Sequence, residues 1–448
     1  MNQQMQRSSY FLRNSISLFL CLAGTLYVHA TEPADSAASG KRRAHWSQRL
    51  TLGGYGEAVM SRNFYSDSYL RYTDAAAKAD AKSHGRFDLP HVVLYVGYDF
   101  GRGWSMGSEI EFEHGGTESA YEIESEEGGE YESEVERGGE VALEQFWMQK
   151  SFCPQANLRL GHIIVPVGMT NQHHLPTEFF GVYRPEGEST IIPCTWHETG
   201  LSVWGKTKLW NHESSLRYEL VFVSGLDSER FGAQSWISGG SASPYEFKIA
   251  NTYAGALRLD FTPLRGLRVG LSGYLGNSFR NTLRETDNEK NAGVKGRVTL
   301  AAFDCSLNRA GWVLRGSALY GHLTDAAHIS NFNRTMPSAS PSPRQFVASD
   351  AYSMGVEAGY DFFSLSRKLR DRQRLYLFGR YDAYDSMWKM EKGTPYDWCG
   401  RQRVAIGFNY YPLKEIVIKG EYARGLLKSK YNDEPSISIG VAYAGFFL

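Results

Sequence analysis

Apart from one short apolar run near its N-terminus, the chain lacks any stretch of 18 consecutive apolar residues. This absence excludes membrane-spanning helices elsewhere in the chain. The chain also lacks a charge imbalance, because 48 lysines and arginines against 49 aspartates and glutamates give a net charge of −1. A nucleic acid is therefore not expected as a partner. Only five cysteines occur in 448 residues, and they lie far apart, so we expect free thiols rather than a disulfide framework.

Catalytic motifs are also scarce. We expect neither a Gly-x-Ser-x-Gly elbow nor a phosphate-cradling glycine loop. His162 lies in a segment that we expect to form a strand, but nothing in the sequence gives it a serine partner. We therefore expect neither an enzyme nor a bound cofactor.

The N-terminus is typical of a secreted protein. Arg7 and Arg13 form a basic region, Ser15 to Tyr27 is apolar, and Val28-His29-Ala30 fits a cleavage site. This pattern predicts a signal peptide over residues 1–30, removed after Ala30. A single-span anchor is the alternative, but the apolar run is short for the roughly 20 residues that a span needs.

The C-terminal segment Ser436 to Leu448 alternates between two kinds of side chain. One face carries Ile437, Ile439, Val441, Tyr443 and Phe447, and the other carries Ser436, Ser438, Gly440, Ala442 and Ala444. Lipid accepts only backbones in which every N–H and C=O is paired, and a sheet meets that demand by closing into a barrel. A strand with one apolar face and one small or polar face is typical of such a barrel.

The same rhythm continues through residues 48–448. Alternating segments are separated by seven short turns and eight long loops in strict rotation, which gives sixteen strands. Aromatic residues, 14% of the chain, flank the short turns, as in the interfacial girdles of membrane barrels. We predict an all-β fold, a transmembrane antiparallel β-barrel with short periplasmic turns and long extracellular loops, preceded by a periplasmic linker over residues 31–47.

Charged residues alternate with apolar residues along the predicted strands, so they gather on one face. Glu109 and Glu111, for example, alternate with Ile110 and Phe112. The same alternation places Arg258, Arg268, Arg297 and Arg380 on that face. Burying so many charges in a dry core would be costly, whereas a water-filled lumen removes that cost.

The third long loop, residues 169–196, is rich in charged and aromatic side chains. If it folds into the barrel, it narrows the pore and sets the charge there. The alternative is an outer loop exposed to solvent. We expect no metal site, because adjacent histidines point in different directions and the spacing matches no ligand motif. The predicted constriction consists of His173, His174, Glu178, Arg184, Glu186 and Glu188 of the loop, with Arg159, Arg258, Arg268, Arg380, Glu109 and Glu111 of the wall.

The second long loop is strongly acidic. Between Glu118 and Glu140 there are ten glutamates and one arginine. Because like charges repel, we expect a solvated, flexible outer loop. The alternative is a vestibule that gathers cations, or a divalent-ion bridge to lipopolysaccharide.

A block of about 45 residues around the third loop resembles a known family. It reads Leu158-Arg159-Leu160-Gly161-His162-Ile163-Ile164-Val165-Pro166-Val167-Gly168, then Asn171, His174, Phe179-Phe180-Gly181-Val182, Arg184-Pro185 and Ile191-Ile192-Pro193-Cys194-Thr195-Trp196-His197-Glu198. This looks like the strand-loop-strand block of Gram-negative outer-membrane porins of the phosphate-selective O/P-like group. The resemblance implies a trimeric porin whose third loop constricts the pore and which passes small anions or other small solutes.

Two features depart from that family. The chain ends in Leu448, where such barrels commonly end in phenylalanine, and the lumen arginines mingle with acidic residues. Phosphate selectivity therefore stays open. We predict a porin in the outer membrane of a Gram-negative bacterium, surrounded by lipid and lipopolysaccharide, through which small solutes and ions diffuse passively. The alternatives are a phosphate- or anion-selective channel of the same fold, and a non-conducting barrel whose outer loops bind partners.

Overall fold

The computed structural model describes most of the chain from residue 48 onward. The predicted signal peptide over residues 1–30 and the linker over residues 31–47 lie outside the described residues, as do parts of several long loops. Described are residues 48–66, 83–113, 119–125, 131–137, 140–210, 213–243, 247–336, 344–428 and 431–448.

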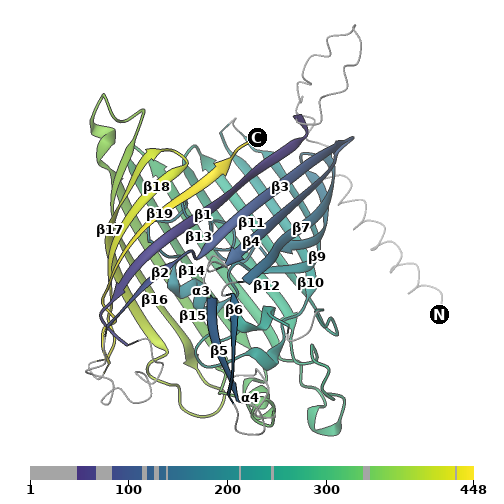
Figure 1. Cartoon of the computed structure of the whole chain (residues 1–448). Helices are drawn as coiled ribbons and strands as arrows, with labels where there is room; N and C mark the ends of the chain where they lie inside the picture. Colours follow the sequence, from purple (N-terminus) through teal and green to yellow (C-terminus); the bar gives the residue numbers. More distant parts are fainter. Residues whose placement is uncertain are drawn as a thin grey trace, which may run out of the picture. The chain divides into compact units, whose positions relative to one another are not determined.

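Seventeen strands form one antiparallel sheet that closes on itself, because β1 pairs with β19 (Figure 1). β2 and β3 both pair with β1 and together make one strand of the barrel, which therefore has sixteen. The predicted sixteen-stranded antiparallel barrel is confirmed. The strands are β1 (Leu50–Asn63), β2 (His84–Asp88), β3 (His91–Gly101), β4 (Trp104–Glu113), β7 (Glu140–Cys153), β8 (Ala156–Ile164), β9 (His197–Lys208), β10 (Ser215–Ser224), β11 (Tyr253–Leu264), β12 (Leu267–Asn277), β13 (Arg297–Arg309), β14 (Trp312–Leu323), β15 (Asp350–Asp361), β16 (Arg374–Lys389), β17 (Gly400–Leu413), β18 (Ile416–Gly425) and β19 (Ser436–Phe446).

Connections alternate in length around the barrel. At one end, called the short-turn end below, tight turns such as Gly101 to Trp104 and Leu413 to Ile416 join the strands. At the other, the long-loop end, the connections include residues 165–196 and 225–252. Gly103 shows why the tight turns need glycine: its φ is +77°, and a Cβ there would lie 2.3 Å from the carbonyl oxygen of Ser151.

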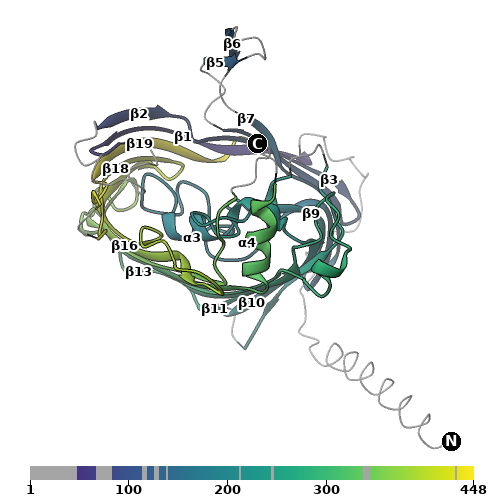
Figure 2. The ribbon, with the colours of Figure 1, turned by 90° about the horizontal axis from the view of Figure 1, so that it is seen from below.

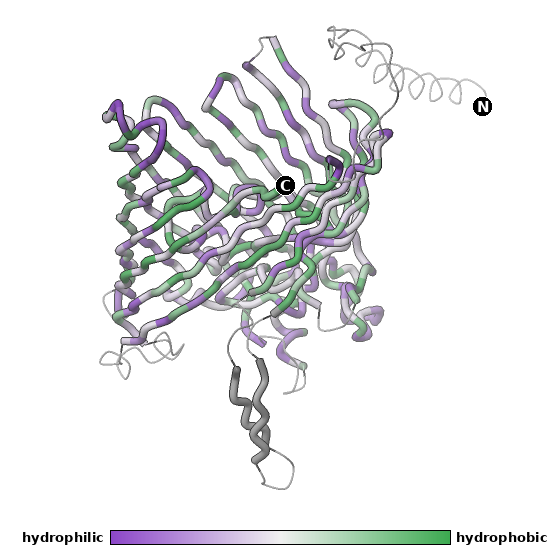
Figure 3. The backbone as a smooth tube through the Cα atoms, turned by 45° about the horizontal axis from the view of Figure 1, so that its top comes forward, coloured by the Kyte–Doolittle hydropathy of each residue, from purple (hydrophilic) through white to green (hydrophobic). Residues whose placement is uncertain are grey.

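Apolar side chains cover the outer face of the barrel. On β19, Ile437, Ile439 and Val441 are 46–53% exposed, whereas Ser436 and Ser438 on the opposite face are 4% exposed. Figure 3 shows the same alternation of hydrophobic and hydrophilic residues along many strands. Large aromatic side chains are exposed beside the short turns, as predicted: Phe100, Trp104, Phe152, Trp210, Trp312, Phe362 and Phe446.

Segments from the long-loop end fold back inside the barrel and fill part of it with an apolar core. α3 (Glu186–Ile191) lies within the ring of strands, and α4 (Ala326–Arg334) lies across the opening at the long-loop end (Figures 1 and 2). Trp236 is fully buried and donates from Nε1 to the carbonyl of Ala348 at 2.9 Å. The lumen is therefore not occupied by water throughout, as a barrel of this width alone would predict. The apolar core includes Trp196, Leu226, Phe231, Trp236, Ile237, Phe279, Ile329 and Val347 of the loops, and Val223, Tyr274, Leu300 and Leu323 of the wall.

The remaining described helices are single turns of 3₁₀ type. Among the described residues, no helix is long and apolar enough to cross a membrane. The four cysteines in the described part of the chain, Cys153, Cys194, Cys305 and Cys399, are free. The 3₁₀ turns are η3 (Ser228–Arg230), η4 (Ser238–Ser241), η5 (Glu289–Asn291) and η6 (Phe362–Leu365).

The expected position of Arg297 on the lumen face was wrong. Its neighbours Val298 and Leu300 are buried in the apolar core. Because side chains alternate along a strand, Arg297 points outward. There it is exposed, and its Nε donates to Oδ1 of Asn277 at 3.4 Å. The apolar core inside the barrel, which alternation alone does not reveal, reverses the expected assignment of faces.

The acidic second loop is also more regular than expected. It contains a separate antiparallel pair, β5 (Ser119–Ser125) and β6 (Tyr131–Arg137). The register places Glu122 opposite Glu134 and Glu124 opposite Glu132. The density of glutamates in this loop therefore does not prevent the two strands from pairing.

One stretch of sequence matches the spacing of a phosphate-binding loop, although no such loop was expected. Gly200, Gly205, Lys206 and Thr207 have the spacing Gly-x₄-Gly-Lys-Thr. All four lie within the extended strand β9, which pairs with β8 and β10. A phosphate-binding loop requires a strand-to-helix turn whose amides converge, so this match carries no such function.

The spacing Gly-x-Ser-x-Gly also occurs, although no such elbow was expected. Gly103-Trp104-Ser105-Met106-Gly107 spans the tight turn before β4 and the start of that strand, which pairs with β3 and β7. A nucleophile elbow requires a strand-to-helix turn, so these residues do not form one.

Candidate pore constriction

The segment between β8 and β9 leaves the barrel wall and returns to it at nearly the same place. We call the closely spaced first and last residues of this segment its neck. Val165 donates its backbone N–H to the carbonyl of Trp196 at 2.8 Å. Inside the neck, the fully buried Asn171 donates from Nδ2 to the carbonyls of Val167 at 2.9 Å and Pro193 at 3.2 Å. Its Oδ1 accepts from the backbone N–H of Trp196 at 2.8 Å. One amide side chain thus joins both arms of the loop.

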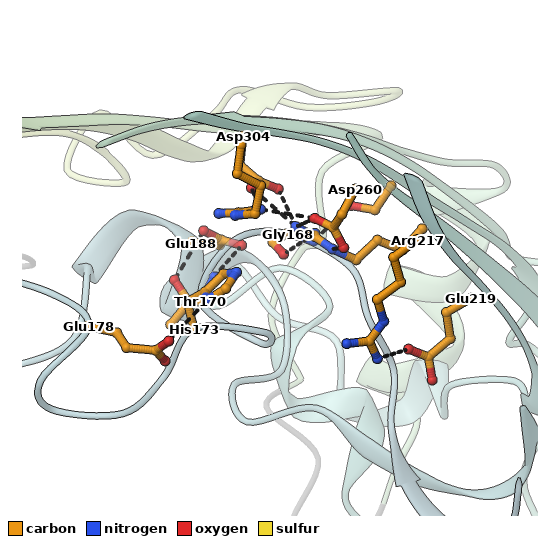
Figure 4. Close-up of polar contacts among 12 residues, drawn as sticks. Gly168, Thr170, His173, Glu178, Glu188, Arg217, Glu219, Asp260 and Asp304 are labelled. Carbon is orange, nitrogen blue, oxygen red and sulfur yellow. Dashed lines mark hydrogen bonds and ion pairs between the residues drawn. The ribbon is translucent and has the colours of Figure 1, made fainter. Parts of the chain in front are cut away.

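An ion-pair cluster on β11, β12 and β13 holds the start of the loop against the wall (Figure 4). Arg258 donates to the carbonyl of Gly168 at 2.8 Å and pairs with Asp260 and Asp304 at 2.8 and 3.0 Å. Arg268 pairs with the same two carboxylates. Arg258 is 1% exposed and Asp304 is fully buried. The charges of this part of the wall therefore neutralise one another, as buried charges must.

Glu188 lies beside the same cluster, on α3. Its carboxylate accepts from the backbone N–H and the hydroxyl of Thr170 at 3.2 and 3.1 Å. Gly168 makes room for it, because a Cβ on Gly168 would lie 1.7 Å from Oε1 of Glu188. Burial raises the pKa of Glu188 to about 7, and the nearby charge of Asp304 adds to the effect.

α3 packs on the inner faces of β15 and β16 (Figure 2). Gly187 permits the close approach, since a Cβ there would lie 2.7 Å from Oγ of Ser353. Glu186 accepts a hydrogen bond from the hydroxyl of Tyr384 at 2.7 Å. It also lies 3.8 Å from Arg401 and 3.6 Å from Arg403 on β17. The helix therefore presents a carboxylate to two guanidinium groups of the wall.

A polar cavity of about 550 Å³ opens beside α3 at the long-loop end of the barrel. Its charged lining is balanced, because five arginines face five acidic residues and His91. Arg184 donates to the hydroxyl of Tyr55 at 3.3 Å. The charged lining residues are Arg86, Arg184, Arg380, Arg401 and Arg403, with Glu57, Glu186, Asp382, Glu421 and Glu434.

A second polar cavity, of about 600 Å³, lies at the short-turn end. Its charged lining is strongly basic: Arg315, Arg370, Arg372, Arg374 and Lys414 against Asp371. Thr177 and Phe180 of the third loop also line it, whereas Tyr183 and Arg184 line the first cavity. The loop segment from Thr177 to Arg184 therefore lies between the two cavities.

The residues predicted from the sequence fall into two groups. Arg184, Glu186 and Arg380 line the cavity at the long-loop end. The others lie in the loop or the wall around it. Arg258 and Arg268 belong to the ion-pair cluster on β11, β12 and β13, and Glu188 lies beside that cluster. His173 lies 3.2 Å from Glu178, and His174 is buried, which lowers its pKa to about 4 with a further contribution from Arg184. Arg159 donates to Gln149, Glu109 accepts from Gln145, and Glu111 contacts His91 at 2.7 Å.

Several charged residues of the two cavities were not singled out from the sequence. Arg401 and Arg403 alternate with Gln402 and Val404 on β17, so the period-two pattern that identified Arg380 could have identified them. The basic cavity is different, because Arg370 and Arg372 lie in a turn. No periodic signal marks such positions as part of a pore mouth.

Comparison with known proteins bears on the fold. No family model matches the chain. An uncharacterized protein of Aquifex aeolicus (strain VF5) is 27% identical over 395 residues, which cover 86% of this chain and 78% of that protein. OmpF of Salmonella typhi, solved in complex with daunomycin, matches with a TM-score of 0.51 and 10% identity over 90% of this chain and 99% of its own. The barrel has the porin fold.

Another solved porin matches with a lower TM-score. An anion-selective porin from Comamonas acidovorans matches with a TM-score of 0.46 and 11% identity, over 88% of this chain and 99% of its own. At these identities the likeness to solved porins concerns the fold alone. It does not extend to the solute, and the phosphate-selective O/P-like group receives no separate support.

Proposed function

We propose that this protein is an outer-membrane porin through which small polar solutes and ions diffuse passively. One observation carries the proposal: two polar cavities open at opposite ends of the barrel, and a single inward-folded loop segment, Thr177 to Arg184, lies between them. Charged walls and a narrow passage are what a channel needs to select solutes by size and charge. The apolar outer face supports a membrane location.

The proposal includes the surroundings of the barrel. Residues 1–30 act as a signal peptide that is removed after Ala30, and residues 31–47 form a periplasmic linker. The short-turn end then faces the periplasm and the long-loop end faces the exterior, in contact with lipid and lipopolysaccharide. We further propose a homotrimer, as the resemblance of the third-loop block implies, with no enzymatic activity and no bound cofactor or metal.

An anion-selective channel is the second candidate, and the basic cavity favours it. Five cationic side chains and one acidic side chain line the short-turn mouth, whereas the opposite cavity is balanced. In series, the basic mouth enriches anions and repels cations before they reach the constriction. Nothing in either cavity singles out phosphate among small anions.

The third candidate is a closed barrel whose loops bind partners outside the cell. The apolar core that fills part of the lumen favours it, because it reduces the space open to water. This candidate predicts a folded protein without conductance.

Single-channel recording separates the three candidates. The full chain is expressed with its own N-terminus, extracted from outer membranes and inserted into a planar bilayer. Stepwise openings in groups of three support the trimeric porin, and a reversal potential of anionic sign under a salt gradient supports the second candidate. A folded barrel that never conducts overturns the channel proposal. Mass spectrometry of the same sample gives the mature N-terminus.

A further inference from the structure

The barrel wall binds the backbone of the third loop at its innermost segment, Phe179 to Val182. Lys419, on β18, donates from Nζ to the carbonyls of Phe179 at 3.1 Å and Gly181 at 2.7 Å. The same ammonium lies 4.0 Å from the ring centroid of Phe179. Lys419 is only 1% exposed. A buried ammonium that uses its donors on two loop carbonyls fixes those carbonyls to the wall.

Two wall carboxylates bind the intervening N–H groups. Glu357, on β15, accepts from the backbone N–H of Phe180 at 3.3 Å. Glu421, on β18, accepts from the backbone N–H of Val182 at 3.2 Å. The wall therefore satisfies the carbonyls and the amides of this segment alternately, with one cation and two anions. Charged partners make such hydrogen bonds stronger than neutral ones.

The wall is also shaped for the side chains of the segment. Phe180 stacks on Phe378 with ring centroids 5.2 Å apart and an interplanar angle of 8°. Gly359 leaves room for its ring, because a Cβ there would lie 2.3 Å from Cζ of Phe180. Gly181 approaches Arg380 and Glu421 so closely that its own Cβ would lie 2.9 Å from an atom of each. The segment is thus seated in a fitted groove.

This segment separates the two polar cavities, so its position decides how wide the passage between them is. Phe180 lines the basic cavity, and Glu421 lines the balanced one. Lys419 lines neither cavity as described above. A change at Lys419 therefore alters the loop without adding or removing a charge on either lining.

We propose that Lys419 is the positioning residue of the constriction: its ammonium holds Phe179 to Val182 against the wall and thereby keeps the two cavities nearly separate. This inference deepens the proposed function, since it names the residue that regulates the width of the same pore. Without the ammonium, the carbonyls of Phe179 and Gly181 lose their buried donor. The segment then leaves the wall and the two cavities join.

Lys419→Met tests the proposal, because methionine keeps most of the side-chain volume and removes the donor. We expect at least a twofold rise in single-channel conductance and passage of larger neutral polymers, measured by exclusion of polyethylene glycols of graded size. Heat-modifiable migration on a gel verifies that the barrel is folded. A folded Lys419→Met channel with the conductance and size limit of the unaltered protein overturns the proposal.

Lys248→Met is the matched control. Lys248 also holds two loop carbonyls, those of Gly240 at 3.3 Å and Ser241 at 2.6 Å, and pairs with Glu198. It lines neither cavity, so general loosening of a loop should leave conductance unchanged in this variant. An equal rise in conductance in Lys248→Met and Lys419→Met overturns the specific role of Lys419.

A second variant covers the case in which Lys419→Met does not fold. Val182→Pro removes the N–H that Glu421 accepts, fixes φ at that position and leaves every wall residue unchanged. It should also widen the pore. The outcomes also separate the two proposals. If the unaltered protein is silent and Lys419→Met conducts, the segment is a closed gate and the open porin is wrong. If the unaltered protein conducts and neither variant differs from it, the porin stands and the role of Lys419 is wrong.

Discussion

Asn171 and Trp196 lie at opposite ends of the third loop, yet Oδ1 of Asn171 accepts the backbone N–H of Trp196 at 2.8 Å. With the two carbonyls that its Nδ2 reaches, this side chain closes the neck of the constriction. Asn171→Ala leaves buried backbone groups without partners, at about 1–3 kcal/mol for each such group. We expect the free energy of unfolding, measured by urea titration in lipid vesicles, to fall by about 3 kcal/mol.

The loop that follows β12 contains a matched control, Asn281, whose side chain bridges both ends of the loop that follows β10. Asn281 is 1% exposed, donates to the carbonyls of Gly225 and Leu226, and accepts from the backbone N–H of Thr252. Asn281→Ala should therefore cost a similar free energy of unfolding. Only Asn171→Ala should also raise the noise of the single-channel current, because only the third loop lies between the two cavities. Equal noise in the two variants would show that the neck does not position the constriction.

Glu188 should make stability depend on pH. Its pKa in the folded state is raised to about 7 by burial, while an unfolded glutamate titrates near about 4.3. Between these values the folded state holds a proton that the unfolded state has lost, so stability is complete below about pH 4.3 and falls as pH rises to about 7. The total loss is about 4 kcal/mol, since one unit of pKa corresponds to about 1.4 kcal/mol.

Glu188→Gln isolates this effect, because glutamine cannot ionise and still offers an oxygen to Thr170. The urea midpoint of the variant should exceed that of the unaltered protein at pH 8 and approach it at pH 4. His174 contributes the opposite slope in both proteins: its lowered pKa of about 4 makes protonation below about pH 6.5 destabilising. Because both proteins contain His174, its contribution cancels when the urea midpoint of one protein is subtracted from that of the other. A difference that does not change with pH would contradict the assignment.

The barrel could be predicted from the sequence because its determinants are local. Alternation on β19 and tight turns such as Gly101 to Trp104 each follow from a few neighbouring residues. Loop placement has no such local signal. Arg297 shows the consequence: its alternation with Val298 is real, but only the apolar core formed by distant loops decides which of the two faces inward.

The site was partly predictable for the same reason. Arg184 and Glu186 stood out because charged residues are dense in the third loop, and Arg380 because it alternates along a strand. Lys419 also alternates, so its inward direction could be predicted. Its contacts with the carbonyls of Phe179 and Gly181 could not, since they join residues about 240 positions apart in the chain.

Cys194 offers a native reporter of the passage, because it lines the balanced cavity. A negatively charged methanethiosulfonate forms a mixed disulfide with the thiolate and releases a sulfinate, which leaves a fixed charge in the passage and should lower conductance. Burial raises the pKa of Cys194 to about 11, and only the thiolate reacts. The rate of block should therefore rise about tenfold per pH unit between pH 7 and pH 10.

Cys194→Ser should abolish that block. The exposed Cys153 ends β7 at the short-turn end, and Cys399 is buried. Cys305 follows the inward-facing Asp304 on β13, so it points away from the lumen. None of the three should therefore substitute for Cys194. Persistent block in Cys194→Ser would place the passage elsewhere in the barrel.

Charge selectivity should depend on the basic cavity at the short-turn end. Arg372 and Arg374 are exposed and line that cavity, so the double change Arg372→Gln, Arg374→Gln removes two of its five cationic side chains. Because the opposite cavity is balanced, the reversal potential under a salt gradient should shift toward cations, most strongly at low ionic strength where screening is weak.

Arg102→Gln, Arg265→Gln is the matched control: both arginines are exposed in short turns at the same end, and neither lines the cavity. If both pairs shift the reversal potential equally, selectivity follows from the net charge of that end of the barrel. If only the first pair does, ions pass through the basic cavity.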